Sequence, residues 1–197
     1  LQLLDSFLKY WEKHGSPDVV TGWNSKQFDI PYLVNRTRKV IGDESVKRFS
    51  PWGVVSPRTV RGKMGRRDVD TYDLMGIAQL DYYDLYQKFT YTQQESYRLD
   101  NIAFVELGER KLSYEEYGDL HTLYQNDHQK FIEYNIRDVD LVDKLEEKLG
   151  LISLAMTLAY KGGVNYEDVL GTTAIWDSII YRILNKFQVA VPPKVET

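Results

Sequence analysis

The chain has no cysteine, and this absence excludes both a disulfide framework and a thiolate metal site. Its histidines do not share the spacing of a metal-ligand set; they are His14, His121 and His128. A metal bound by this sequence must therefore be held by oxygen atoms. No apolar run approaches the roughly 20 residues that span a bilayer, and no secretory signal is visible. We therefore expect an intracellular protein with no membrane partner.

Charge is distributed unevenly along the sequence. The formal net charge of -4 argues against indiscriminate binding to nucleic acid. Residues 100–147 are rich in acids, whereas the charged residues within 45–67 are all basic: Lys47, Arg48, Arg58, Arg61, Lys63, Arg66 and Arg67. The basic stretch is either a solvated loop or a surface that meets phosphate groups, and composition alone leaves both interpretations open.

The apolar patterns predict an α/β unit followed by a helical segment. With 197 residues and 43% hydrophobic content, the chain can bury a sizeable core. We expect strands over residues 18–22 and 77–83, and an exposed β-hairpin within residues 50–73 with its tip near Arg61 to Arg66. Helical periodicity predicts helices over residues 1–14, 30–41, 84–89, 96–107, 126–149, 151–160 and 172–187. The alternation favours the α/β class, and the helical last part indicates a boundary near Gly150.

Asn24 and Asp29 lie where the strand over residues 18–22 leads into a helix. Each has an ordinary explanation. Asp29 suits a helix cap just ahead of Pro31, and Asn24 suits a tight turn. Taken singly, neither residue indicates a functional site.

Asp138 occupies a position where a core residue is expected. In the helix over residues 126–149, Tyr134 and Asp138 fall on the same stripe as Leu141 and Leu145. A buried carboxylate costs several kcal/mol unless a charge or hydrogen bonds compensate. Asp138 therefore needs a cation or donors opposite it, and the ordinary explanation is the backbone or nearby Arg137. Together, however, Asn24, Asp29, Tyr134 and Asp138 are the residue types of an oxygen-ligated Mg²⁺ site.

Two short motifs resemble those of family B DNA polymerases. WNSKQFD, ending at Asp29, is similar to the second exonuclease motif of that family, and YNIRD, from Tyr134 to Asp138, is similar to the third. Further segments resemble phage-type members in the same order: KRFSP, LDYYDLYQKF, SYRLDNIA and IWDSIIYRIL. Each motif is weak alone, but their order and spacing over nearly the whole chain are specific.

This resemblance implies a ribonuclease H-like exonuclease fold, a mixed sheet flanked by helices, and 3′→5′ proofreading hydrolysis of DNA. It implies that Asp29 and Asp138 are catalytic ligands of two Mg²⁺ or Mn²⁺ ions and that Tyr134 orients the attacking water. Asn24 and Phe28 would contact the single-stranded 3′ primer end. The β-hairpin would place basic residues against DNA phosphates, namely Arg58, Arg61, Lys63, Arg66 and Arg67.

The sequence departs from the family at the first exonuclease motif, an Asp-x-Glu pair that supplies the remaining metal ligands. The acids before Asn24 are Asp5, Glu12 and Asp18, and none is followed by an acid two residues later. The resemblance gives no ligand role to Asp81 or Asp84. The polymerase palm motifs are also absent.

We therefore expect residues 1–150 to form a partial exonuclease domain, incomplete at its N-terminus, and residues 151–197 to form a helical segment that leads towards the polymerase N-terminal domain and palm. The partner would be the remainder of the polymerase chain, in the host-cell cytoplasm if the protein is viral. The isolated chain would be inactive and would self-associate through an exposed sheet edge. The alternative is a split-polymerase subunit, or a catalytically silent domain that binds DNA or another polymerase chain.

Overall fold

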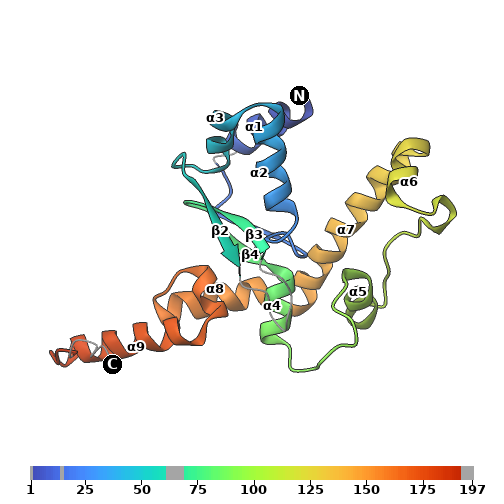
Figure 1. Ribbon diagram of the computed structural model, residues 1–197. Coiled ribbons are helices and arrows are strands. Elements are labelled where there is room, and N and C mark those ends of the chain that lie inside the picture. Colours follow the sequence, from blue (N-terminus) through green and yellow to red (C-terminus); the bar gives the residue numbers. More distant parts are fainter. Residues whose placement is uncertain (1, 14–15, 61–68, 192–197) are drawn as a thin grey trace.

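The computed structural model describes residues 2–13, 16–60 and 69–191 (Figure 1). Its helices and strands are α1 (Gln2–Lys13), β1 (Val19–Gly22), α2 (Asp29–Val40), α3 (Asp43–Val46), η1 (Lys47–Phe49), β2 (Val55–Val60), β3 (Val69–Leu74), β4 (Ala78–Asp81), α4 (Tyr82–Phe89), α5 (Leu99–Leu107), η2 (Glu115–Tyr117), α6 (Leu120–Asn126), α7 (His128–Leu149), α8 (Leu151–Gly162), η3 (Tyr166–Leu170) and α9 (Thr172–Lys186). The α/β class is confirmed. None of these described helices is long and apolar enough to cross a membrane.

The strands form two small sheets. β1 and β4 pair in parallel, from Val19 opposite Ala78 to Gly22 opposite Asp81. β2 and β3 pair antiparallel and form the expected hairpin, whose tip lies outside the described residues. The expectation of one mixed sheet is therefore wrong for the described part of the chain. A tight turn joins β3 to β4, with the Ile77 N–H donating to the Leu74 carbonyl and Gly76 at a positive φ of 91°, and β4 pairs with β1 and not with β3.

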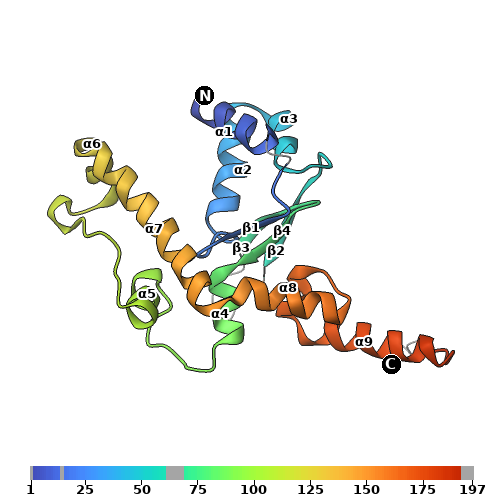
Figure 2. The same ribbon diagram turned by 180° about the vertical axis from the view of Figure 1, so that it is seen from behind.

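The main core gathers side chains of β4, α4, α5, α7, α8 and η3 into one buried cluster, and Figure 2 shows α4 and α8 directly below the strands. Its fully buried side chains include Leu80 on β4, Leu85 on α4, Ile102 on α5 and Leu141 on α7. The aromatic rings of Tyr82 and Tyr86 are also fully buried here, so they serve the core.

This core continues past the boundary expected near Gly150. Gly150 has left-handed backbone angles and ends α7, and α8 begins at the next residue. Leu151 and Ala155 of α8 then join the same buried cluster as β4 and α4. The division into residues 1–150 and 151–197 stays a prediction. Because α8 shares this core, the shared packing argues that residues 151–197 do not fold independently.

A second core fixes the helix that begins at Asp29. Leu8 of α1, Val34 of α2, Phe49 of η1 and Leu74 of β3 are almost fully buried against one another. In Figure 1, α1, α2 and α3 accordingly lie together above the strands. Burial of these apolar side chains holds α2, whose first residue is Asp29, next to β1.

Local capping sets several helix starts that differ from the expected ones. α4 begins at Tyr82 rather than at residue 84, because Asp81 is its N-cap and accepts a hydrogen bond of 3.0 Å from the Tyr83 N–H. α7 begins after Asp127, whose carboxylate accepts from the Lys130 N–H at 3.0 Å. The sequence did not indicate α6, which Asp119 caps.

Candidate active site

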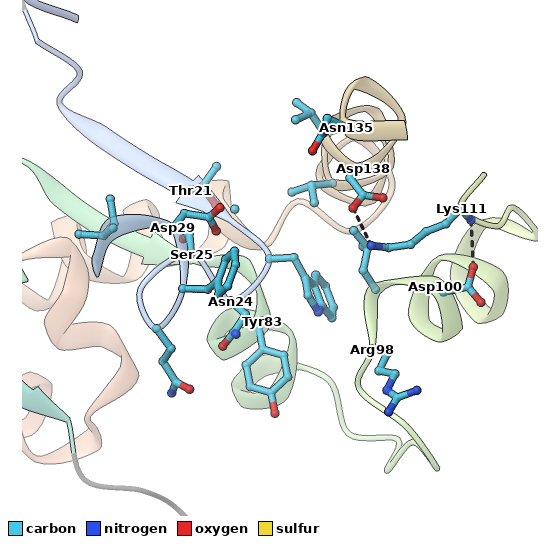
Figure 3. Close-up of a pocket in the computed structure, with 18 of the residues that line it drawn as sticks. Thr21, Asn24, Ser25, Asp29, Tyr83, Arg98, Asp100, Lys111, Asn135 and Asp138 are labelled. Carbon is cyan, nitrogen blue, oxygen red and sulfur yellow. Dashed lines mark hydrogen bonds and ion pairs between the residues drawn. The ribbon is translucent and has the colours of Figure 1, made fainter. Parts of the chain in front are cut away.

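A cleft of about 1370 Å³ opens beside the carboxyl ends of β1 and β4 (Figure 3). Asn24 and Asp29 reach it from the segment after β1, and Tyr134 and Asp138 reach it from α7. The structure therefore brings together four residues that the sequence singled out, although they are far apart in the chain. In α/β proteins, ligands bind at the carboxyl ends of parallel strands.

Asp29 is the first residue of α2, but its side chain does not cap the helix. The N-cap residue is Phe28, and no side-chain cap hydrogen bond forms there. The capping explanation of Asp29 is therefore wrong. The pKa of Asp29 is raised because surrounding atoms remove water from its carboxyl group, and a hydrogen bond from its own backbone N–H only partly offsets this. Although the residue as a whole is exposed to the cleft, its carboxylate has no ion pair within the described part of the chain.

Asp138 faces a lysine that the sequence did not indicate. Lys111 Nζ donates to Asp138 Oδ2 at 2.6 Å and to the Tyr134 hydroxyl at 3.3 Å. Arg137, the expected partner, instead binds Glu109 and Asp140. The second carboxylate oxygen, Asp138 Oδ1, is buried and has no hydrogen-bond partner among the described residues.

Lys111 is fixed by the helix on the opposite side of the cleft. Its backbone N–H donates to Asp100 Oδ1 of α5 at 2.9 Å, which directs the side chain towards α7 (Figure 3). Burial disfavours the Lys111 ammonium, but the hydrogen bond and the charge of Asp138 outweigh burial and raise the pKa of Lys111. Burial, as the largest cause, raises the pKa of Tyr134, so its phenol stays neutral near pH 7.

Asp81 organises the loop that carries Asn24. Its carboxylate is almost fully buried and accepts from the Asn24 N–H and the Lys26 N–H, each at 2.9 Å, besides capping α4 through Tyr83. Burial raises the pKa of Asp81 to about 6, although the three backbone hydrogen bonds act in the opposite direction. Asn24 adopts a positive φ of 65° in this loop, which asparagine tolerates better than most residues.

The remaining site residues are placed as follows. Phe28 lines the cleft, and its exposed ring lies nearly parallel to that of Tyr32, with centroids 6.5 Å apart. Arg58 lies on β2, outside this cleft, and pairs with Asp73 at 3.2 Å. The four other basic residues of the hairpin lie outside the described residues: Arg61, Lys63, Arg66 and Arg67. DNA contact by any of these residues stays a prediction.

The oxygen ligands at the cleft suit a divalent cation in type but not in number. Asp138 has an orphaned carboxylate oxygen and Asp29 has no cation opposite it, so both have unused capacity for a hard metal ion. Within residues 2–13, 16–60 and 69–191, however, no group of three or more Asp, Glu or His side chains is placed to hold a metal. Two carboxylates alone would leave such an ion largely hydrated.

Replacing Lys111 with methionine is expected to destabilise the metal-free chain. The substitution leaves Asp138 without a cation, and we expect the free energy of unfolding to fall by about 1 to 2 kcal/mol, because both side chains keep some access to water. Urea denaturation in the presence of a chelator measures this change. Lys47→Met removes an exposed lysine paired with Glu44 and should change stability by less than about 0.5 kcal/mol. If Asp138→Asn in the Lys111→Met background recovers no stability, the unpaired carboxylate is not the cause.

The fold is that of an α/β protein whose candidate site lies at the carboxyl ends of two parallel strands and is lined by Asp29, Asp138 and Lys111. A family model described as DNA polymerase family B, exonuclease domain, matches residues 1–102, and the chain belongs to this family. The matched range includes Asn24, Phe28 and Asp29, whereas Tyr134 and Asp138 lie beyond it. The resemblance read from the motifs is thereby confirmed.

Individual relatives support the same assignment. The chain is 36% identical to the DNA-directed DNA polymerase of Escherichia phage RB69. The alignment of 191 residues covers 97% of this chain and 21% of that protein. The chain is 34% identical over 190 residues to the DNA-directed DNA polymerase of Enterobacteria phage T4, covering 96% of this chain and 21% of the relative. The DNA polymerase delta catalytic subunit of Dictyostelium discoideum is 27% identical, over 85% of this chain and 16% of the relative. The chain thus spans about a fifth of the length of the phage polymerases it matches.

Proposed function

We propose that this chain supplies part of a 3′→5′ proofreading exonuclease, which removes the 3′-terminal nucleotide of DNA within a replicative DNA polymerase. One observation carries the proposal: in a chain of the exonuclease-domain family, Asp29, Tyr134 and Asp138 converge on one cleft. A ribonuclease H-like fold is part of the proposal. The parallel pair of β1 and β4 with helices packed around it supports that fold.

Asp29 and Asp138 would hold divalent ions, Mg²⁺ or Mn²⁺, two in a complete site. Bound ions of this kind supply hydroxide near neutral pH and offset charge on the attacking and leaving oxygens of a phosphodiester. Tyr134, with its neutral phenol, would orient the attacking water through its hydroxyl. Lys111 pairs with Asp138, and its ammonium would also be able to offset the charge of a phosphate group of bound DNA.

The DNA end would enter the cleft past Asn24 and Phe28. The exposed ring of Phe28 suits stacking against an unpaired base, an interaction that does not depend on the sequence of the DNA. The β-hairpin residues, beginning with Arg58 on β2, would follow the phosphate backbone.

The partner in this proposal is the rest of a polymerase chain. Because only two carboxylates in the described residues are placed as metal ligands, we propose that an Asp-x-Glu strand from the rest of the polymerase completes the site, and that the chain alone is inactive. The same shortage of ligands favours the second candidate function, a catalytically silent domain or split-polymerase subunit that binds DNA or another polymerase chain. Self-association through the sheet edge stays a prediction.

The decisive experiment measures release of the terminal nucleotide from 3′-labelled single-stranded DNA, with Mg²⁺ or Mn²⁺. The chain is assayed alone and together with a polypeptide that carries an Asp-x-Glu strand. We expect no cleavage by the chain alone, cleavage by the mixture, and loss of that cleavage on addition of a chelator. A mixture that binds the DNA and does not cleave it would contradict the exonuclease and support the silent domain.

A further inference from the structure

Lys26 connects the loop between β1 and α2 to three other segments. It lies between Asn24 and Asp29 and is only 7% exposed. Its backbone N–H donates to Asp81 Oδ2, and its carbonyl accepts a hydrogen bond from the Thr71 hydroxyl on β3. Its ammonium pairs with Glu167 Oε2 of η3 at 3.3 Å. The loop that carries Asn24 and Phe28 and leads into Asp29 is therefore tied to β4, to the hairpin and to the helical segment.

Glu167, the ion-pair partner of Lys26, lies on η3 and contacts several segments. Its second oxygen, Oε1, accepts from the Gln79 N–H of β4 at 2.6 Å. Arg58 of the hairpin strand β2 lies 3.8 Å from Oε2. One carboxylate thus contacts β4, the site loop and the hairpin at the same time.

Burial makes this ion pair a strong constraint on the loop. The side chain of Lys26 is 9% exposed, and Glu167 is its ion-pair partner in the described chain. A buried ammonium without its carboxylate is strongly disfavoured. If Glu167 loses its charge or moves, the Lys26 side chain must turn towards water. The neighbouring loop residues would move with it.

We propose that the Lys26–Glu167 ion pair positions the exonuclease site. Through this pair, the placement of the hairpin and of the segment around η3 determines the placement of the loop that bears Asn24 and leads into Asp29. Lys26 and Glu167 are positioning residues and touch no substrate atom in this proposal. The inference rests on the proposed function for its catalytic meaning, whereas the mechanical link rests on the contacts alone.

The first test is amide hydrogen exchange over residues 22–29 in the Glu167→Gln and Lys26→Met variants. Glutamine keeps an acceptor for the Gln79 N–H, so Glu167→Gln removes the charge with little change in shape. We expect exchange of the Asn24 and Lys26 amides to become roughly tenfold faster in each single variant. The double variant should be no worse than either single one, because the two residues act as one pair. Lys26→Arg should keep the protection, and Glu44→Gln, which breaks an exposed pair, should leave it unchanged.

The second test separates kcat from KM in the chain completed with an Asp-x-Glu strand. Misplacement of Asp29 should lower kcat for the 3′ end roughly tenfold in Glu167→Gln and leave KM for DNA within about twofold. Unchanged loop exchange in both single variants would overturn the link, whatever the hydrolysis rates are. Faster exchange with unchanged kcat would overturn the positioning role. Failure of the proposed function is visible separately, as absence of Asp29-dependent cleavage by the unsubstituted mixture.

Discussion

Replacing Asp29 or Asp138 with asparagine is expected to lower the rate of metal-dependent DNA hydrolysis at least about a hundredfold. Asparagine keeps the size of the side chain but removes the negative charge that a divalent cation requires. The two residues lie on different helices, α2 and α7, on opposite sides of the cleft (Figure 3). Each substitution therefore removes a different part of the proposed ligand set, and neither residue can replace the other. The rate is measured on 3′-labelled single-stranded DNA with the chain completed by an Asp-x-Glu strand.

A matched control is available on the same face of the molecule. Asp143 also lines the cleft from α7 and is exposed, so Asp143→Asn removes one charge from the cleft without touching the proposed ligands. We expect its rate to stay within about threefold of the unsubstituted chain, because a single exposed charge acts only through a screened field. Equal losses in all three variants would mean that the net charge of the cleft matters and that no specific metal site exists there.

The sequence was sufficient to predict the acids of the candidate site but not the groups that hold them. Asp29 and Asp138 belong to short motifs with a fixed local pattern, so they are visible without a structure. Lys111 pairs with Asp138 across 27 positions of the chain, in a stretch with no periodicity to mark it. The only signal was indirect: a carboxylate on a buried stripe needs a cation, and the pattern could not say which one.

Asp81 shows a different limit of sequence reasoning. The resemblance gave it no ligand role, and the expected strand over residues 77–83 included it; in the structure it is the N-cap of α4. The same carboxylate also holds the Asn24 loop from 57 positions away. Neither the helix cap nor the long-range contact of Asp81 was visible in the local sequence pattern. The two separate sheets were missed for a related reason: the hairpin of β2 and β3 joins neighbouring strands and has a local signal, whereas β1 pairs with β4 across more than 50 positions of the chain.

Replacing Asp81 with alanine is expected to lower the free energy of unfolding by about 3 kcal/mol near pH 4.5. The substitution removes the acceptor of the Asn24, Lys26 and Tyr83 N–H groups. The Lys26 N–H lies in a buried environment where water replaces the acceptor poorly. Denaturant unfolding of the two chains, followed by tryptophan fluorescence, measures the difference. The control is Asp119→Ala: Asp119 is exposed, and as the N-cap of α6 it accepts a hydrogen bond from the Thr122 N–H, so its loss should lower the free energy of unfolding less than the loss of Asp81 does.

The cost of Asp81→Ala should shrink as the pH rises, because the pKa of Asp81 is raised to about 6 in the folded chain and is about 3.9 in an unfolded one. Between these values the folded state holds a proton that the unfolded state has released. The stability that Asp81 contributes is therefore complete below about pH 3.9, falls as the pH rises, and is constant above about pH 6. From pH 4.5 to pH 7 the difference between the two chains should decrease by roughly 2 kcal/mol. A difference that grows with pH would mean that the ionised carboxylate is the form that the three backbone N–H groups stabilise, and that burial does not dominate its pKa.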